Sequence, residues 1–328
     1  MRGAAGNTRP DATCGSYPGP LRVGVVAPPW IAVPPPAYGG TDGVIDRLAR
    51  GLQAAGHDVR LWTTGDATCP VPRGSTFETA AGEPMGLTTT ELEHTIAAYE
   101  WFTAERCDVV HDHTLAGPLV ATGPAPVVTT NHNPFGLPGL AAIYRRISAT
   151  TRIIAISRHH ASVARRLGIP VAHVIHHGVD VDEFAVGDGT GDERGPYLAF
   201  VGRMDPTKGV GTAIDVARAA GWRLLIAAKM RDEGEISYYE RDVAPRCTDG
   251  IDYVGEVGPP DKARLIGGAA ALLNPIRWPE PFGLVMLEAL AIGTPVITTP
   301  CGAAPEIVAH CRTGFVCDDA RQMVDAVG

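Results

Sequence analysis

The chain has 328 residues, of which 45% are hydrophobic and 20% are charged, and its formal net charge is -8. This length predicts a globular protein of about two domains, and the negative charge argues against nucleic acid as a partner, because a phosphate backbone is repelled. Its seven cysteines are odd in number and contain no C-x-x-C pair, which argues against a disulfide framework or a zinc ribbon and favours a reducing compartment.

The N-terminus is rich in Gly, Pro and Thr, and we expect residues 1–20 to form a disordered tail. This stretch lacks the apolar core of about 7–15 residues that a signal peptide needs, and no later run reaches the roughly 18 apolar residues of a membrane span. We therefore expect a cytoplasmic protein without an integral membrane segment.

The first half of the chain predicts an open α/β sheet. Residues 21–30, "LRVGVVAPPW", read as a buried strand, and a Gly-rich turn, a helix and a second strand follow in "YGGTDGVIDRLARGLQAAGHDVRLWTT". An apolar face of this helix is predicted at Val44, Ile45, Leu48 and Leu52. Further short strands are expected at "CDVVHDH", "PVVTTNH" and "RIIAIS".

A second α/β series follows a break in composition. Residues 186–196, "VGDGTGDERGP", are rich in Gly and Asp and form the predicted linker between domains 21–185 and 197–328. In the second domain, strands are expected at "YLAFVGRM", "WRLLIAA", "IDYVGEV", "AALLNP" and "TPVITT", with helices between them. The predicted fold is thus two Rossmann-like, doubly wound domains, with ligands in the cleft at the carboxyl ends of the strands.

Two basic residues follow the first strand of the second series. In "FVGRMDPTKGVGTAI", Arg203 ends the strand and Lys208 lies on a turn before a helix. Together with the free amides of that helix, the pair indicates a diphosphate site; the plainer alternative is two solvated side chains. The G-x-G-x-x-I pattern lacks the third glycine of a dinucleotide fingerprint, and no Walker P-loop is present.

The segment "RWPEPFGLVMLEALAIGTPVI", residues 277–297, places two acids around an apolar run. Prolines on both sides of Glu280 keep it in a loop, and a helix that begins near the second proline contains Glu288. The first amides of this helix, from about Phe282 to Leu284, lack intrahelical partners and favour an anion. The alternative is that Glu280 only caps the helix and Glu288 lies at the surface.

With these motifs in order, the chain resembles the retaining nucleotide-sugar glycosyltransferases of family 4, the group 1 glycosyltransferases, which have the two-domain GT-B fold. The resemblance rests on "YGGTDGVIDRLARGL", "DVVHDH", "VVTTNH", "AISRHHA", "VIHHGVD", "FVGRMDPTKG", "EPFGLVMLEALAIGTPVI" and "TGFV". The Pro-rich loop before "YGG" is most similar to members from antibiotic biosynthesis.

The resemblance implies roles for the second domain, which would bind the donor. Arg203 and Lys208 would hold the diphosphate, Glu280 the hydroxyls of the donor sugar, and Glu288 the ribose. The amides that would assist at the sugar and phosphate are those of Phe282, Gly283 and Leu284. In the first domain, which would bind the acceptor, Gly39 and Gly40 would let the backbone approach the phosphates, and His132 would face the reacting centre.

The implied activity is transfer of a hexose from a nucleoside-diphosphate sugar, with UDP as the expected nucleotide, to an acceptor hydroxyl, without a metal or another cofactor. His111 and His113 lie two apart at a strand end, but no further residue at ligand spacing favours a metal. A glycosidase that uses Glu280 and Glu288 as its two carboxylates leaves the basic pair unexplained.

The chain departs from the family pattern in two places. Residues 176–180 read His-His-Gly-Val-Asp where the family commonly has Pro-Asn-Gly-Val-Asp, and the sequence stops about a dozen residues after "TGFV". We therefore expect a second domain that is truncated at its C-terminus. A nucleotide-sugar-binding protein without turnover is the alternative function that this shortening suggests.

Overall fold

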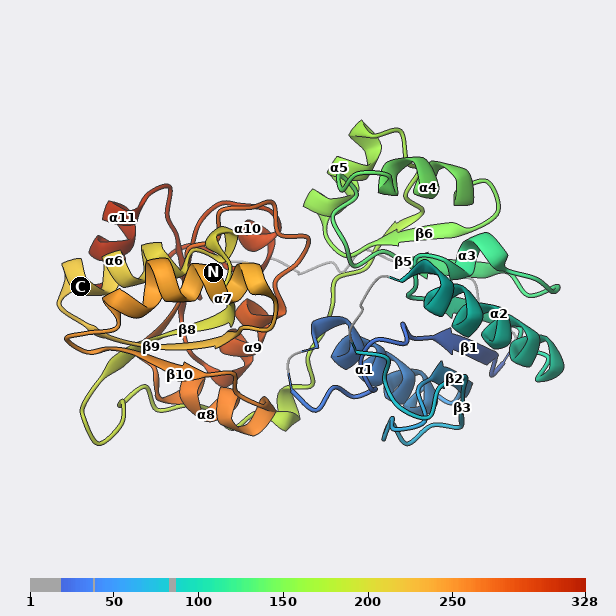
Figure 1. Cartoon of the computed structure of the whole chain (residues 1–328), viewed down its shortest axis with the longest axis horizontal. Helices are drawn as coiled ribbons and strands as arrows, with labels where there is room; N and C mark the ends of the chain where they lie inside the picture. The colour runs from blue at the N-terminus through green and yellow to red at the C-terminus, as the bar shows by residue number, and fades with distance from the viewer. Residues whose placement is uncertain (1–18, 38, 83–86) are drawn as a thin grey trace, which may run out of the picture.

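The computed structural model describes residues 19–37, 39–82 and 87–328. These residues form two α/β halves that lie side by side, each built on a parallel sheet (Figure 1). Most of the predicted tail, residues 1–20, lies outside the described residues. The sheets end at Val174 and begin again at Tyr197, and the domain boundaries at 185 and 197 stay a prediction.

The N-terminal half carries a seven-stranded parallel sheet among the described residues. Its strands are β1 (Arg22–Val26), β2 (Asp58–Thr63), β3 (Arg73–Ser75), β4 (Val109–Asp112), β5 (Val127–Thr130), β6 (Arg152–Ala155) and β7 (His173–Val174). Its helices are α1 (Gly40–Ala54), α2 (Thr88–Ala104), α3 (Gly117–Val120), α4 (Leu140–Ile147) and α5 (Arg158–Arg166).

The C-terminal half carries a six-stranded parallel sheet in the part of the chain that is described. Its strands are β8 (Tyr197–Arg203), β9 (Arg223–Lys229), β10 (Ile251–Gly255), β11 (Ala271–Asn274), β12 (Val296–Thr298) and β13 (Gly314–Val316). Its helices are α6 (Val210–Ala220), α7 (Glu233–Tyr238), α8 (Pro259–Gly268), α9 (Leu284–Ile292), α10 (Ala304–Ile307) and α11 (Ala320–Val327).

In both sheets the order in which strands are added reverses at one point. The strand orders are β3-β2-β1-β4-β5-β6-β7 and β10-β9-β8-β11-β12-β13, so the chain winds outward first on one side of β1 or β8 and then on the other. This is the doubly wound order, in which loops after the central strands diverge and leave a crevice at the carboxyl edge. The predicted α/β architecture is confirmed, and the crevices fall after β1 and β4 and after β8 and β11.

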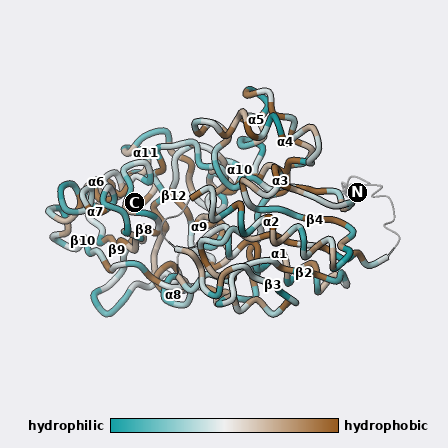
Figure 2. The backbone as a smooth tube through the Cα atoms, turned by 45° about the vertical axis from the view of Figure 1, so that its right-hand side comes forward, coloured by the Kyte–Doolittle hydropathy of each residue, from teal (hydrophilic) through white to brown (hydrophobic). Residues whose placement is uncertain are grey.

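Apolar side chains fill both faces of each sheet. In the C-terminal half, one core packs α6 and α11 against β8 and β9, and another packs α8 and α9 against the opposite face. In the N-terminal half, α1, α2 and the pair α4 and α5 each cover their own apolar cluster. Hydrophilic residues follow many of the outer loops (Figure 2). None of the described helices is both long and apolar enough to cross a membrane.

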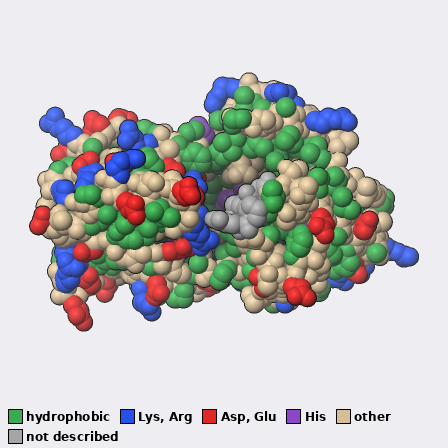
Figure 3. Space-filling model, viewed as in Figure 1, with side chains coloured by type: hydrophobic (Ala, Val, Ile, Leu, Met, Phe, Trp, Pro, Cys, Tyr) green, Lys and Arg blue, Asp and Glu red, His purple; other side chains and the backbone are tan. Residues whose placement is uncertain are grey.

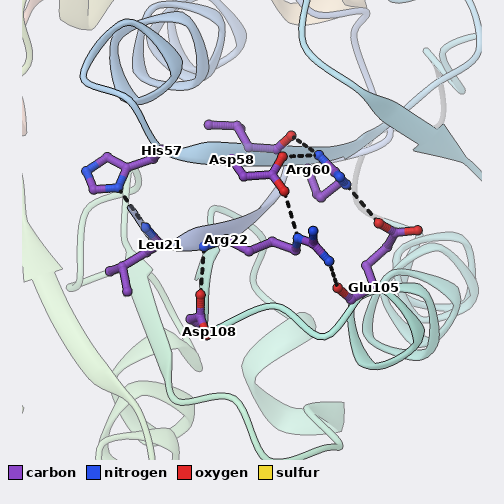
Figure 4. A network of polar contacts seen from close by, with 8 residues as sticks. Leu21, Arg22, His57, Asp58, Arg60, Glu105 and Asp108 are labelled. Carbon is purple, nitrogen blue, oxygen red and sulfur yellow. Dashed lines mark hydrogen bonds and ion pairs between the residues drawn. The ribbon is translucent and has the colours of Figure 1, made fainter. Parts of the chain in front are cut away.

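An ion network ties the amino ends of β1 and β2 together (Figure 4). Arg22 donates to Asp58 at 2.7 Å and to the carbonyl of Glu105, while Arg60 donates to Glu105 at 2.8 Å and also contacts Asp58. The backbone amide of Arg22 also donates a hydrogen bond to the side chain of Asp108. These contacts lie at the edge of the sheet opposite to the crevice, where they stabilise the scaffold.

The buried face of α1 includes Ile45, as predicted, and Leu52 packs against the same core, but the rest of the face differs from the prediction. The structure buries Asp42, Ile45, Asp46 and Ala49, whereas Val44, Leu48 and Leu52 are half-buried. Val44 and Leu48 line a second cavity of about 510 Å³ beside the sheet. The spacing of apolar residues did not predict the buried face, because one side of α1 lines the second cavity and the side that packs inward carries two carboxylates.

Candidate active site

A cavity of about 790 Å³ opens between the two halves at the carboxyl ends of both sheets. The space-filling view shows the hollow between the halves, with histidine side chains visible within it (Figure 3). All the predicted site residues except Arg203 line this cavity: Gly39, Gly40, His132, Lys208, Glu280, Phe282, Gly283, Leu284 and Glu288. The two crevices predicted from the strand orders thus form one site.

The loop after β8 positions Lys208 through a capped turn. Asp205 accepts the amide of Thr207 at 2.7 Å, which starts a short 3-10 turn that ends at Lys208. Gly209 follows with φ of +83°, and a Cβ atom there would lie 2.0 Å from the carbonyl oxygen of Pro275. Only glycine fits this position, so the close approach of two loops fixes where Lys208 points.

Glu280 meets Lys208 inside the cavity wall. The Lys208 ammonium donates to Glu280 Oε2 at 2.5 Å, and the Trp278 indole donates to the same oxygen at 3.0 Å. The Lys208 nitrogen also lies 4.8 Å from the centre of the Trp278 ring. Both charged side chains are mostly buried, with about 15% of each exposed. A cation and an anion therefore stand side by side at the loops that follow β8 and β11.

Glu288 lies on α9 and is buried, not at the surface. Lys262 of α8 donates to Glu288 Oε1 at 2.7 Å, which leaves Oε2 without a hydrogen-bond donor from the described protein. One turn of helix separates Glu288 from the start of α9. A carboxylate with one oxygen paired and one oriented by that pair suits a ligand with hydroxyl groups.

The start of α9 corrects the predicted helix. The helix begins at Leu284, not near Pro281, because Gly283 adopts a left-handed conformation with φ of +99° at the N-cap. The unpaired first amides therefore begin at Leu284, and the amides of Phe282 and Gly283 belong to the preceding loop. All three residues still line the cavity.

The N-terminus of α1 faces the N-terminus of α9 across the cavity. A Cβ atom at Gly40 would lie 3.4 Å from Leu284 Cδ1, and one at Gly39 would lie 2.5 Å from Pro35 Cβ. Gly40 thus lies close to the C-terminal half, whereas Gly39 allows the preceding proline loop of its own half to pack against the start of α1. Two helix N-termini that converge on one space favour an anion there, because both present free amides and positive dipole ends.

Arg203 is the predicted site residue that the structure does not bring into the cavity lining. Its guanidinium lies 3.8 Å from Glu235 Oε1, and Glu235 is buried. Lys229 of the neighbouring strand lies 3.9 Å from the same oxygen. Arg203 stands at the end of β8 as predicted, and its part in binding a diphosphate stays a prediction.

A row of four imidazoles forms what we call the histidine wall: His132 and His177 line the cleft, and His111, His113 and His177 line the second cavity. His111 stacks on His113 with ring centres 4.3 Å apart, His113 lies 5.2 Å from His132, and His132 stacks on His177 at 5.1 Å. His113 Nδ1 and His132 Nε2 share a hydrogen bond of 2.9 Å. His177 then contacts Phe282 of the other half at 5.0 Å. The row connects β4 with the centre of the cleft.

Burial keeps this row neutral. Desolvation is the main cause that lowers the pKa of His113 and of His132 well below its ordinary range, and repulsion from the neighbouring imidazoles adds to it. Burial also lowers the pKa of His111 and His177, in each case to about 4. At neutral pH the wall therefore offers hydrogen bonds and aromatic surface, but no positive charge.

Three residues contribute to the site although the sequence analysis gave them no role there: Trp278, Lys262 and His177. Trp278 donates to Glu280, and Lys262 donates to Glu288. Trp278 could have been predicted from its place two residues before Glu280, whereas Lys262 lies on a helix that carries no motif. His177 stands where the family pattern departs, and only the fold shows it beside His132. In the described chain, no group of three or more His, Cys, Asp or Glu side chains is arranged to hold a metal.

Solved structures share this arrangement of two facing parallel sheets. Sucrose-phosphate synthase from Thermosynechococcus elongatus superposes with a TM-score of 0.76 at 20% identity, covering 94% of this chain and 88% of that one. AviGT4, a glycosyltransferase involved in avilamycin A biosynthesis, superposes with a TM-score of 0.66 at 25% identity, covering 93% and 88%. The fold is that of a GT-B glycosyltransferase.

Sequence comparison gives the family. Residues 38–183 match the model of glycosyltransferase family 4, and residues 195–328 match that of the group 1 glycosyl transferases. Alpha-maltose-1-phosphate synthase from Mycolicibacterium smegmatis is 30% identical over 251 residues, which are 65% of this chain and 65% of that protein. The chain belongs to the family 4, group 1 glycosyltransferases, and the predicted resemblance is confirmed.

Proposed function

We propose that this protein is a retaining hexosyltransferase that uses a nucleoside-diphosphate sugar, with UDP as the nucleotide, and transfers the sugar to an acceptor hydroxyl without a metal. The observation that carries the proposal is the contact between Lys208 and Glu280 at the centre of the cleft. A glycosyl phosphate needs a cation at its phosphate and a hydroxyl-binding acceptor at its adjacent sugar ring. The two side chains supply these groups within one hydrogen bond of each other.

Cleavage of the glycosyl-phosphate bond moves negative charge to the diphosphate and positive charge to the sugar. Lys208, Arg203 and the first amides of α9 are proposed to stabilise the diphosphate as it leaves. Glu280 is proposed to bind sugar hydroxyls, and Glu288 to accept hydrogen bonds from the ribose. Side-chain and backbone groups thereby take the role that a divalent cation fills at other diphosphate sites.

The neutral histidine wall supports the same assignment. A protonated imidazole next to the sugar would oppose the positive charge that develops there, whereas a neutral imidazole can donate or accept a hydrogen bond. His132 Nε2 is occupied by His113, so Nδ1 is the nitrogen proposed to contact the sugar. This assignment makes His132 a group that orients the donor and not a proton shuttle.

The names of relatives agree with sugar transfer but differ in acceptor. Beside the alpha-maltose-1-phosphate synthase stands a phosphatidyl-myo-inositol mannosyltransferase of Mycolicibacterium smegmatis, which matches 94% of this chain at 27% identity. We propose an acceptor that enters from the N-terminal half, where the second cavity and the histidine row meet.

The test incubates the purified protein with UDP-, GDP- and dTDP-hexoses in the presence of EDTA, with and without candidate acceptors, and measures release of the nucleoside diphosphate by chromatography. We expect release from the UDP-sugar, and its loss in Lys208→Ala and Glu280→Gln. A product with the donor's anomeric configuration, read by NMR, supports retention.

Release that requires a divalent metal would contradict the proposed metal independence. Release from GDP- or dTDP-sugars alone would contradict UDP as the nucleotide. Tight donor binding with no cleavage under any condition favours the alternative of a nucleotide-sugar-binding protein without turnover.

A further inference from the structure

One carboxylate of the C-terminal half reaches directly into the N-terminal half. Glu306, on α10, accepts the backbone amide of Arg158 at 2.8 Å and that of His159 at 2.7 Å. It also accepts a hydrogen bond of 2.9 Å from His176 Nε2. Only about 15% of the Glu306 side chain is exposed. Three hydrogen bonds from one side chain thus cross between the halves.

The two amides belong to the first turn of α5. Ser157 is the N-cap, and its hydroxyl accepts the amide of His160, so Glu306 takes the two amides that the helix itself leaves unpaired. A carboxylate at this position also gains from the positive end of the helix dipole. Burial raises the pKa of Glu306, but His176 and the two amides outweigh it and lower the pKa overall. The carboxylate is therefore charged at neutral pH.

The segment that carries Glu306 also holds the loop of Glu280. The amide of Ala303 donates to the carbonyl of Glu280 at 2.9 Å, and the amide of Glu306 donates to the carbonyl of Ala303 at 2.8 Å. Gly302 has φ of +64°, and a Cβ atom there would lie 2.3 Å from the backbone of Glu280. The segment from Gly302 to Glu306 is thus in tight contact with the proposed sugar-binding loop at one end and with α5 at the other.

We propose that Glu306 is a positioning residue that locks α5 of the N-terminal half onto the C-terminal half and so couples closure of the cleft to the placement of Glu280. When the cleft is closed, the carboxylate caps α5, and the same short segment presses against the backbone of Glu280. When the cleft opens, the first two amides of α5 lose their acceptor, and the segment that holds the Glu280 loop loses its anchor on α5. The kinetic part of this inference rests on the proposed transferase function, whereas its structural part does not.

The fold offers a variant that removes one donor from the opposite half. Arg158 is the first residue of α5, where proline is favoured because its missing N–H is not needed within the helix. Ser157 has extended angles, φ of -156° and ψ of 165°, which suit a residue before proline. Arg158→Pro therefore deletes the hydrogen bond to Glu306 while α5 is retained, and Arg158→Ala is the matched control that keeps the amide.

The test compares Glu306→Gln, Arg158→Pro and their double variant with Arg158→Ala. A second control, Asp319→Asn, alters a carboxylate that caps α11 within one half. Small-angle scattering with and without UDP reports closure, titration reports donor affinity, and initial rates give kcat and KM. Melting curves identify any variant that fails to fold.

We expect Glu306→Gln and Arg158→Pro each to lower kcat by about tenfold and to increase the radius of gyration with UDP, since a charged hydrogen bond is worth about ten- to a hundredfold in an equilibrium. Donor affinity should change by less than about threefold, and the double variant should resemble the stronger single variant because both remove one contact. The two controls should behave as the wild type.

Equal behaviour of Arg158→Pro and Arg158→Ala in both scattering and rate would overturn the inference, as would additive effects in the double variant. If Glu306→Gln does not fold, the comparison of the two Arg158 variants decides the question. If the wild type cleaves no donor, the proposed function fails, and scattering alone then decides whether the contact holds the halves together.

Discussion

The two halves build their sides of the site in different ways. In the C-terminal half, Lys208 and Glu280 come from two loops that follow neighbouring central strands, and each loop carries a recognisable motif. In the N-terminal half, His111 and His113 come from the end of β4, while His132 and His177 come from two later segments. These rings meet through stacking, burial and one hydrogen bond between His113 and His132. A charged clamp therefore stands opposite a neutral wall.

This difference teaches which kind of site can be found without a structure. Charged residues that follow buried strands can be assigned to a site once the strand pattern is known, because parallel strands bring their carboxyl ends to one edge of the sheet. Histidines cannot be assigned in this way, because a histidine in a sequence can equally be a buried residue of the core without a role in the site. Changes at the Lys208–Glu280 pair should therefore impair both donor binding and rate, and changes at the histidine wall should impair the rate alone.

The largest effect is expected at the clamp. Lys208→Ala should lower kcat by about 10²–10³, because it removes a preorganised positive charge from the leaving diphosphate. It should also weaken donor binding, which calorimetric titration would measure beside the initial rates. Arg264→Ala, which removes a cation from an exposed pair with Asp261 on α8, is the control. A wild-type rate in Lys208→Ala would show that this side chain does not stabilise the leaving diphosphate.

The next effect is expected at the neutral wall. His132→Ala should lower kcat by about 10–100-fold, as for the loss of an orienting contact, with little change in the dissociation constant for the nucleotide. Because the pKa of His132 lies well below its ordinary value, the wild-type rate should show no ionisation of this group between pH 6 and 8. His173→Ala, at an exposed position of β7, is the control.

A pH profile near neutrality that His132→Ala abolishes would show a charged imidazole instead, and the contrast between the two sides would not hold.

A smaller effect should separate binding from chemistry within the charged side. Glu288→Gln should weaken nucleotide binding by about tenfold, because a carboxylate accepts hydroxyl hydrogen bonds more strongly than an amide does. Its kcat at saturating donor should stay within about threefold of the wild type. Rates measured over a range of donor concentrations distinguish the two parameters. A large loss of kcat with unchanged KM would place Glu288 at the reacting centre and not at the ribose.

The smallest expected effect concerns stability. Burial raises the pKa of Asp42, in the first turn of α1, from its ordinary value of 3.8 to about 7. The folded state therefore binds this proton more tightly than the unfolded state, so the contribution of Asp42 to stability is greatest below about pH 4 and is lost as the pH rises through about 7. Asp42→Asn removes this cost and should stabilise the protein at pH 8 by on the order of 2 kcal/mol.

Urea unfolding of both proteins at pH 5 and pH 8 measures this difference, and the gain should be smaller at pH 5. A gain that is equal at the two pH values would show that the carboxyl group does not titrate in this range.

Much of the fold was readable because both sheets consist of compact apolar strands separated by glycine-rich turns. The β8 strand and the loop to Lys208 lie where they were expected, and so does the acid that follows β11. The start of α9 was misplaced by three residues, because a proline can begin a helix and only the left-handed Gly283 shows that this one does not. Long-range contacts such as Glu306 with α5 leave no trace in local sequence.

The side of α1 that faces the core was also misjudged. Burial of Asp42 and Asp46 in place of Val44 and Leu48 depends on what surrounds the helix, and periodicity cannot supply that information. The orientation of Arg203 toward Glu235 is of the same kind, since it is set by a buried acid on α7.

The division between a charged donor clamp and a neutral wall is tested most directly by titrating UDP, GDP and dTDP into the wild type, Lys208→Ala and His132→Ala. We predict that UDP binds the wild type most tightly, that Lys208→Ala weakens UDP binding by at least about tenfold, and that His132→Ala leaves UDP binding nearly unchanged. Equal binding of UDP to the wild type and to Lys208→Ala, or a loss as large in His132→Ala, would contradict the division between a charged donor clamp and a neutral wall.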